Sequence, residues 1–308
     1  MKNGNKKNLV WGLSIVTALL LAVSGCQSRY GELDLGIYQY RDTKDLVRFV
    51  YDAAMLVQQE GVLNLRRHRN IKQKKDTEDY YLYVYSIDGT NLYHEGMPQL
   101  EGKNLLDVTD KNGKKITRHI LRAIVNPVNP HGWVHYTWWE PGKFYPVPKS
   151  SCHFMVTTPD GQQVYVGGGI DYPHEEKEFI RVIVDDAVMR IQKEGRAAIA
   201  EIADPFSEYN YRDVRSFVFT ADGNALISPV VNEKFQQINI IESVDEVGHK
   251  PFRKALERLQ KRESTWEVFL AKSRYQRGLI KKCLYLRKVP LEGRVVYVGA
   301  VTDLPQPP

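Results

Sequence analysis

The chain has 308 residues, 43% of them hydrophobic, and a formal net charge of +6 at pH 7. Residues 1–25 contain three lysines and no acidic residue, so their removal leaves 283 residues with a charge of +3. This small excess argues against a nucleic-acid partner, because binding to phosphate backbones requires clustered Lys and Arg. The most basic run, residues 65–75, is followed directly by Asp-Thr-Glu-Asp, and we expect it to form a solvated helix end or loop.

The N-terminus has the pattern of a secretory signal. Three lysines precede an apolar run over residues 9–23 that is short for a membrane span. The run ends in Val-Ser-Gly-Cys at 23–26, which resembles the bacterial lipobox, in which the cysteine is lipidated and becomes the new N-terminus. The resemblance implies a lipoprotein signal peptide over 1–25, acyl chains such as palmitate on Cys26, and a tether over 26–45. An ordinary secretory signal with an incidental cysteine is the alternative.

Acyl chains contribute about 0.8 kcal/mol per buried CH₂, so two or three of them anchor a protein to a membrane. Gln27 is not the aspartate that marks retention in the inner membrane of some bacteria. We therefore expect a lipid-anchored protein of the cell envelope that faces the periplasm, with the outer membrane favoured over the inner.

The sequence contains an internal repeat. Residues 50–61 (VYDAAMLVQQEG) match residues 184–195 (VDDAVMRIQKEG) at seven of twelve positions, at an offset of 134. Further pairs follow in the same order at offsets of 131 to 135, among them SIDGTNL (86–92) with TADGNAL (220–226), Trp133 with Trp266, Cys152 with Cys283, and YVGGGID (165–171) with YVGAVTD (297–303). This order predicts a duplication, with modules over 46–172 and 178–305.

Each module is predicted to open on a long amphipathic helix. Apolar residues recur at helical spacing in both copies, namely Leu46, Val47, Val50, Ala54, Leu56 and Val57, and Val184, Val188, Ile191 and Ile199. Asp-Gly turns at 88–89 and 222–223 then predict a hairpin in each copy.

The second half of each module is predicted to hold a short helix and three strands. The helix is expected around 116–125 and 252–260, and the strands roughly over 132–139, 151–157 and 163–170 in the first copy. The fold class is therefore α+β, with two modules that each combine a long N-terminal helix, a five-stranded antiparallel sheet and a short helix.

Two cysteines remain beyond residue 26. Cys152 and Cys283 would lie in a compartment that permits disulfides. A bridge between equivalent places in two modules would require the modules to meet there, so we expect free, buried thiols. The number of cysteines alone leaves a disulfide open.

The order of these elements and three segments resemble the Cache domain, a PAS-like extracellular sensing fold. The segments are LEGKNLLDVTDKNG (100–113), GWVHYTWWEPG (132–142) and PVPKSSCHFMV (146–156). The first copy matches best, through Gly102, Asn104, Leu105, Asp107, the pair Tyr136 and Trp138, and Lys149. The second copy has Phe269 and Ala271 in place of that pair, so its pocket is expected to be degenerate.

The resemblance implies a pocket for a small organic acid between the sheet and the loops that cover it. Lys149, His135 and the hydroxyls of Tyr136 and Tyr83 suit a carboxylate, since they supply charge-assisted donors. Trp133 and Trp138 would form apolar walls. The alternative is that the aromatic strand is ordinary core and that Lys149 is a solvated loop residue.

Other polar residues of the first copy are expected to be structural. We expect His94 and His153 to be structural histidines, and Asp107 and Asp110 to cap or orient the loop and the short helix. The triple glycine at 167–169 is expected to allow a close backbone approach or a bulge.

Metal, cofactor and catalytic interpretations are not favoured. The segment DVTDKNGK (107–114) lacks the alternating oxygen ligands of a calcium loop, and HEEKE (174–178) lacks the second histidine of a zinc-protease helix. No serine, histidine and aspartate stand in a recognisable nucleophile context. We predict no enzyme, no cofactor and no metal.

The expected function is that of a sensor. The resemblance implies small-molecule sensing, and because no output segment follows Pro308 we expect the protein to signal through an unidentified envelope or receptor protein. A non-catalytic envelope interaction or scaffold protein with vestigial pockets is the alternative.

Overall fold

The computed structural model describes residues 33–67, 80–139, 144–212, 214–229, 239–272 and 278–304. Cys26, the predicted signal peptide and part of the predicted tether lie outside these residues. None of the helices in the described ranges is long and apolar enough to cross a bilayer. The chain divides into two compact units, residues 1–35 and residues 36–308, and all helices and strands below belong to the second unit.

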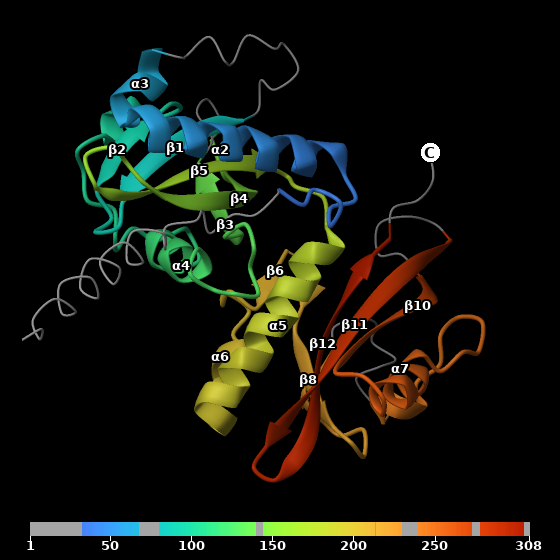
Figure 1. Ribbon diagram of the computed structural model, residues 1–308. Coiled ribbons are helices and arrows are strands. Elements are labelled where there is room, and N and C mark those ends of the chain that lie inside the picture. Colours follow the sequence, from blue (N-terminus) through green and yellow to red (C-terminus); the bar gives the residue numbers. More distant parts are fainter. Residues whose placement is uncertain are drawn as a thin grey trace, which may run out of the picture. The chain divides into compact units, whose positions relative to one another are not determined.

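The first sheet has five antiparallel strands in the order β2-β1-β5-β4-β3 (Figure 1). Its strands are β1 (Tyr81–Ser86), β2 (Asn91–His94), β3 (Val134–Trp139), β4 (Pro146–Thr157) and β5 (Gln163–Asp171). The long helix α2 (Arg41–Glu60) packs on β4 and β5, and its buried residues include Leu46, Val50 and Val57. The short helix α4 (Ile116–Ala123) covers the opposite face.

The second sheet has the same strand order, β9-β8-β12-β11-β10. Its strands are β8 (Phe217–Thr220), β9 (Ala225–Ile227), β10 (Ser264–Lys272), β11 (Leu279–Leu291) and β12 (Arg294–Asp303). Helix α5 (Lys177–Glu194) packs on β11 and β12, and α7 (Pro251–Leu259) packs against β10 (Figure 1). The predicted mixture of helices with antiparallel five-stranded sheets is confirmed.

Several short elements were not predicted. They are α3 (Val62–Arg67), α6 (Ala198–Ala203), the paired strands β6 (Asn210–Tyr211) and β7 (Val214–Arg215), and the 3₁₀ turns at 98–100, 195–197 and 240–242. Ile199 lies in α6 rather than in the long helix, because Gly195 ends α5 with a positive φ of 61°. Gly61 ends α2 in the same way, at φ 82°.

The strand registers correct one landmark of the repeat. Cys152 pairs with Gly168 of β5, and the equivalent pair in the second sheet is Tyr285 with Ala300. Cys283 therefore lies two residues before the position that corresponds to Cys152, on the same face of its strand. Both thiols are buried and free, which confirms that prediction. Burial raises the pKa of each thiol, to about 11 for Cys283.

The triple glycine permits close packing on both faces of β5. A Cβ on Gly167 would overlap Tyr83 and His153, and one on Gly168 would lie 2.6 Å from Cγ2 of Val50 in α2. Gly299 holds the same place in the second sheet, beneath Phe217 and Leu286. The predicted close backbone approach at the triple glycine is confirmed, and it allows α2 to pack closely on the first sheet.

We predict that Gly168→Ala lowers the free energy of unfolding by about 1–3 kcal/mol, because the added methyl overpacks the contact between α2 and β5. Gly96→Ala is the matched control, since its Cβ would meet the Tyr81 ring at an ordinary 3.4 Å. Urea unfolding measures both variants. Equal stabilities for the two would contradict the proposed close packing.

Candidate ligand-binding site

The predicted site residues divide between the two faces of the first sheet. Tyr83, Tyr136, Trp138 and Lys149 lie on the face that α4 covers, because Tyr136 pairs with Lys149 across β3 and β4 and Trp138 is two residues further along β3. Trp133 and His135 point to the opposite face, since side chains alternate along a strand. The structure therefore brings four of the six together.

Trp133 and His135 pack against the start of α5. The Trp133 ring lies 4.6 Å from the Phe179 ring, and its Nε1 donates to the Tyr38 hydroxyl at 2.7 Å. The His135 ring lies between Phe179, at 4.8 Å, and Tyr211, at 4.1 Å. These contacts give Trp133 an architectural role.

A small cavity of about 30 Å³ lies on the face covered by α4. That volume holds about one water molecule. Its lining comprises Tyr81, Tyr83, Tyr85, His94, Leu105, Val108, Ile116, Thr117, Ile120, Tyr136 and Trp138. Tyr81 and Tyr85 were not among the predicted site residues, although the alternation of tyrosines along β1 places them on the same face as Tyr83.

Lys149 is a buried cation that contacts the lining residue Tyr81 and does not itself line this cavity. Its side chain is fully buried, its Nζ lies 2.6 Å from Oδ1 of Asp171, and it donates to the Tyr81 hydroxyl at 2.9 Å. The interpretation of Lys149 as a solvated loop residue is wrong, because β4 already begins at Pro146. Asp171 was missed, since only the register of β4 against β5 places it opposite Lys149.

A neutral histidine and a serine hydroxyl lie next to the lining residues Tyr83 and Tyr136. Nδ1 of His153 lies 2.6 Å from the Gly132 carbonyl and must donate to it, so Nε2 accepts from the Tyr83 hydroxyl at 2.8 Å. Burial lowers the pKa of His153 to about 4. The Ser151 hydroxyl is buried without a hydrogen bond of normal geometry, close enough to Tyr136 to affect its pKa, which burial raises to about 12.

His94 borders the cavity from β2. Its Nδ1 accepts from the backbone N–H of Met97 at 3.0 Å, and its ring stacks on Tyr81 and Tyr83. Burial, aided by the charge of Lys149, lowers its pKa to about 4. His94 is therefore a neutral wall of the cavity at pH 7.

A family model described as a Cache domain matches residues 69–303. The chain belongs to the Cache domain family. Cache domains are extracellular small-molecule-sensing domains of chemoreceptors. This single family model spans both sheets of the chain. No curated protein matches the chain.

Solved structures of chemoreceptor domains are similar to the chain. A methyl-accepting chemotaxis protein of Vibrio parahaemolyticus is 24% identical over 42% of this chain and 88% of its own, with a TM-score of 0.34. A Cache chemosensory domain solved for its carboxylic acid recognition is 18% identical over 44% and 100%, with a TM-score of 0.34. The domain of the Pseudomonas aeruginosa PAO1 amino acid chemoreceptor PctB, in complex with L-Arg, is 12% identical over 85% and 87%, with a TM-score of 0.31.

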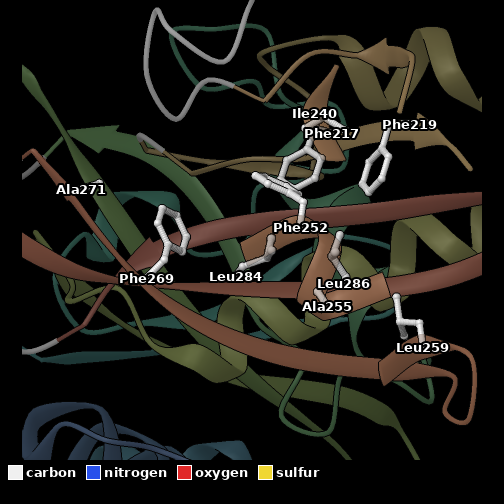
Figure 2. Close-up of a cluster of buried hydrophobic side chains, with 10 residues drawn as sticks. All are labelled: Phe217, Phe219, Ile240, Phe252, Ala255, Leu259, Phe269, Ala271, Leu284 and Leu286. Carbon is white, nitrogen blue, oxygen red and sulfur yellow. The ribbon is translucent and has the colours of Figure 1, made fainter. Parts of the chain in front are cut away.

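The second sheet of this Cache chain offers an internal comparison. Its strand registers place apolar residues where the first sheet has hydroxyls or imidazole (Figure 2). Phe217, Phe219, Phe269, Leu284 and Leu286 stand at the positions of Tyr83, Tyr85, Tyr136, Ser151 and His153. The corresponding face of the second sheet, packed on α7, is an apolar core.

The Lys149–Asp171 pair is repeated in the second sheet. Lys282 and Asp303 occupy the equivalent positions and form an ion pair. That pair is more exposed, with 17% and 45% of the two side chains accessible against 0% and 14% for Lys149 and Asp171. The lysine–aspartate pair is thus common to both sheets, but in the first sheet it is more buried and lies beside tyrosine side chains.

The predicted loop acids have the expected structural roles. Asp110 accepts from the backbone N–H groups of Asn112 and Lys114, at 2.8 and 2.9 Å, and from Thr137. Asp107 is exposed and binds Arg118 of α4, which together with Lys115 lowers its pKa to about 2. Across the described ranges, no group of three His, Cys, Asp or Glu side chains is arranged to hold a metal.

We predict that the protein loses stability as the pH falls from about 6.5 to 4. Burial lowers the pKa of His94, His135 and His153 to about 4, 3 and 4, below their ordinary value of 6.5. In this window the unfolded chain binds more protons than the folded one, which destabilises the fold by up to about 3 kcal/mol per histidine. Burial raises the pKa of Asp186, to about 6, and also those of Asp52 and Glu176, and these three carboxyl groups oppose the effect in part.

Urea unfolding at pH 7.5 and pH 5 measures the loss. His94→Asn, which keeps an acceptor for Met97, should reduce it, whereas His174→Asn at an exposed site should not. Equal unfolding free energies at the two pH values in the wild-type protein would contradict the buried, neutral histidines.

Proposed function

We propose that this protein is an exported, lipid-anchored sensor that binds a small organic anion in the cavity of its first sheet. A short carboxylate such as formate or acetate is the ligand whose size fits best. The observation that carries the proposal is the contrast between the two sheets, with polar groups buried on one and apolar side chains at the same positions of the other.

The contrast argues for function because buried polar groups are costly to a fold. A buried group without a partner costs about 1–3 kcal/mol, whereas an apolar replacement of similar shape is often neutral or stabilising. The second sheet packs Phe269 and Leu284 at the positions of Tyr136 and Ser151. Folding therefore does not require hydroxyl groups at these positions, and binding of a ligand would explain why the first sheet has them.

The chemistry of the cavity suits a carboxylate. Its oxygens could accept from Nζ of Lys149, which is shared with Asp171, and from the Tyr136 hydroxyl. Trp138 and Tyr85 provide apolar walls, and His94 is neutral, so it adds no competing charge. The resting volume of about 30 Å³ holds about one water molecule, so formate or acetate would require the surrounding side chains to move outward, and larger acids would require more movement.

The proposal treats the two sheets as two Cache-like modules, over 46–172 and 178–305. The first binds the ligand and the second is a degenerate copy. Occupancy is passed to a partner protein of the envelope, and the protein itself carries out no reaction. The repeated strand order and the ends of α2 and α5 at Gly61 and Gly195 support this division.

A scaffold without a ligand is the second candidate. The observation in its favour is the Lys282–Asp303 pair, which shows that a cross-strand lysine and aspartate can stand in this fold beside an apolar core. On this view Lys149 would be architectural. The two candidates differ in whether a short carboxylate stabilises the protein.

We predict that formate or acetate raises the melting temperature of the mature protein. A ligand at 100 times its dissociation constant stabilises by about 2.7 kcal/mol. Tyr136→Phe, which copies Phe269, should weaken binding about 10- to 100-fold through loss of one hydrogen bond to a charged group. Lys149→Met should abolish the shift, and Lys282→Met at the equivalent position should leave it intact.

Thermal shift and isothermal titration calorimetry measure these effects. No stabilisation by any short carboxylate, or a shift that persists in the Tyr136→Phe and Lys149→Met double variant, would overturn the proposed site and favour the scaffold.

We also predict that Cys26→Ser releases the protein from membranes in cell fractionation, because the acyl chains would have no attachment point. Ser24→Thr, which keeps the cysteine, is the control and should remain membrane-bound. Membrane association of the Cys26→Ser protein would reject the lipid anchor.

A further inference from the structure

A second and larger cavity, of about 340 Å³, lies on the other side of β3. It is bounded by the end of α4 and the loop that follows, by the start of β3, by the middle of α5, and by Glu208 and Tyr209 beyond α6. Its volume is in the range of small-molecule sites. Trp133 and His135 line it, so two of the three predicted site residues that do not line the smaller cavity meet here; the third is Lys149.

Lys114 is a buried cation in the wall of this cavity. It is 9% exposed, and its Nζ donates to the His135 carbonyl at 2.7 Å. It forms no ion pair with any residue in the described part of the chain, and burial lowers its pKa. An ammonium buried with a single hydrogen bond is costly, and an anion beside it would offset the cost.

Asp186 is the matching acid on α5. Its Oδ1 accepts from Nδ2 of Asn126 at 2.8 Å, and it too has no ion pair within the described ranges. The other acid of the lining, Glu208, is already engaged by Arg122 at 2.7 Å and His119 at 2.8 Å. Lys114 and Asp186 thus face the same cavity without an ion pair, and the exposed Lys193 also lines it without one in the described ranges.

His135 adds an unfilled hydrogen-bonding position. Its side chain is 7% exposed, Nδ1 lies 2.7 Å from the Ser150 hydroxyl, and Nε2 is buried with no hydrogen-bond partner. Either tautomer leaves Nε2 able to accept or donate one more bond. Buried polar atoms without hydrogen-bond partners are rare, and one in a residue that lines a cavity indicates a bound ligand.

We propose that this cavity is a second binding site, which takes a small zwitterion of the amino-carboxylate class. Its carboxylate pairs with Lys114 and its ammonium group pairs with Asp186. A simple carboxylate would satisfy Lys114 and leave Asp186 unpaired, so the site discriminates in favour of the zwitterion. The site stands on residues other than Lys149 and Tyr136 and does not depend on the function proposed for the smaller cavity.

Isothermal titration calorimetry of the mature protein with L-alanine and propionate tests the proposal, because these probes differ by the ammonium group. L-Alanine should bind at least about tenfold more tightly than propionate. Lys114→Met and Asp186→Asn should each weaken L-alanine binding by about tenfold or more, and Asp186→Asn should reduce the preference over propionate. Lys261→Met, at an exposed lysine outside the cavity, should have no effect.

Stability separates loss of binding from loss of fold. Both cavity variants remove an unpaired charge and keep the side-chain shape, so the ligand-free melting temperature should equal or exceed that of the wild type. L-Alanine binding that both variants retain, or a wild-type protein that binds no L-alanine, would overturn the site. Lys149→Met should remove formate or acetate binding, so failure of one cavity is distinguishable from failure of the other.

Discussion

Burial of charge and hydroxyl groups on one face of the first sheet is the constraint on which this account depends. An ammonium group inside a protein must have an acid and further acceptors around it, because its desolvation is costly. Lys149 obtains them from Asp171 and Tyr81, and the tyrosines of β1 complete the polar layer. The fold tolerates this layer because the rest of the sheet is tightly packed against α2.

The second sheet shows what the same architecture becomes when the polar layer is absent. Phenylalanine and leucine take the positions of tyrosine, serine and histidine, and α7 closes over an apolar core (Figure 2). Gly167 and Gly299 permit the same close packing in their two sheets, so the backbone architecture is shared, whereas the polarity of the packed side chains differs. The architecture therefore does not require the polar residues of the first sheet.

The sequence was sufficient to predict elements with strong local signals. Helical spacing predicted α2 and α5, and the Asp-Gly turns predicted both hairpins, but the predicted pocket combined Trp133 and His135 with residues on the opposite face of β3. The pairing register of strands that lie far apart in the chain could not be predicted from the sequence. The burial of Lys149 agrees with its predicted place in a pocket, but its pairing with Asp171 was missed because that pairing depends on the register of β4 against β5. The cavity bounded by Lys114 and Asp186 joins segments 72 residues apart, and no local pattern marks such a meeting.

A crystal structure of the mature protein grown with acetate would locate the ligand. We expect electron density for one acetate within hydrogen-bonding distance of Lys149 Nζ and the Tyr136 hydroxyl, and none beside Lys282 and Phe269 in the second sheet. Acetate bound equally beside both lysines, or an unchanged first-sheet cavity at saturating acetate, would contradict the claim that the buried polar layer of the first sheet is the ligand site.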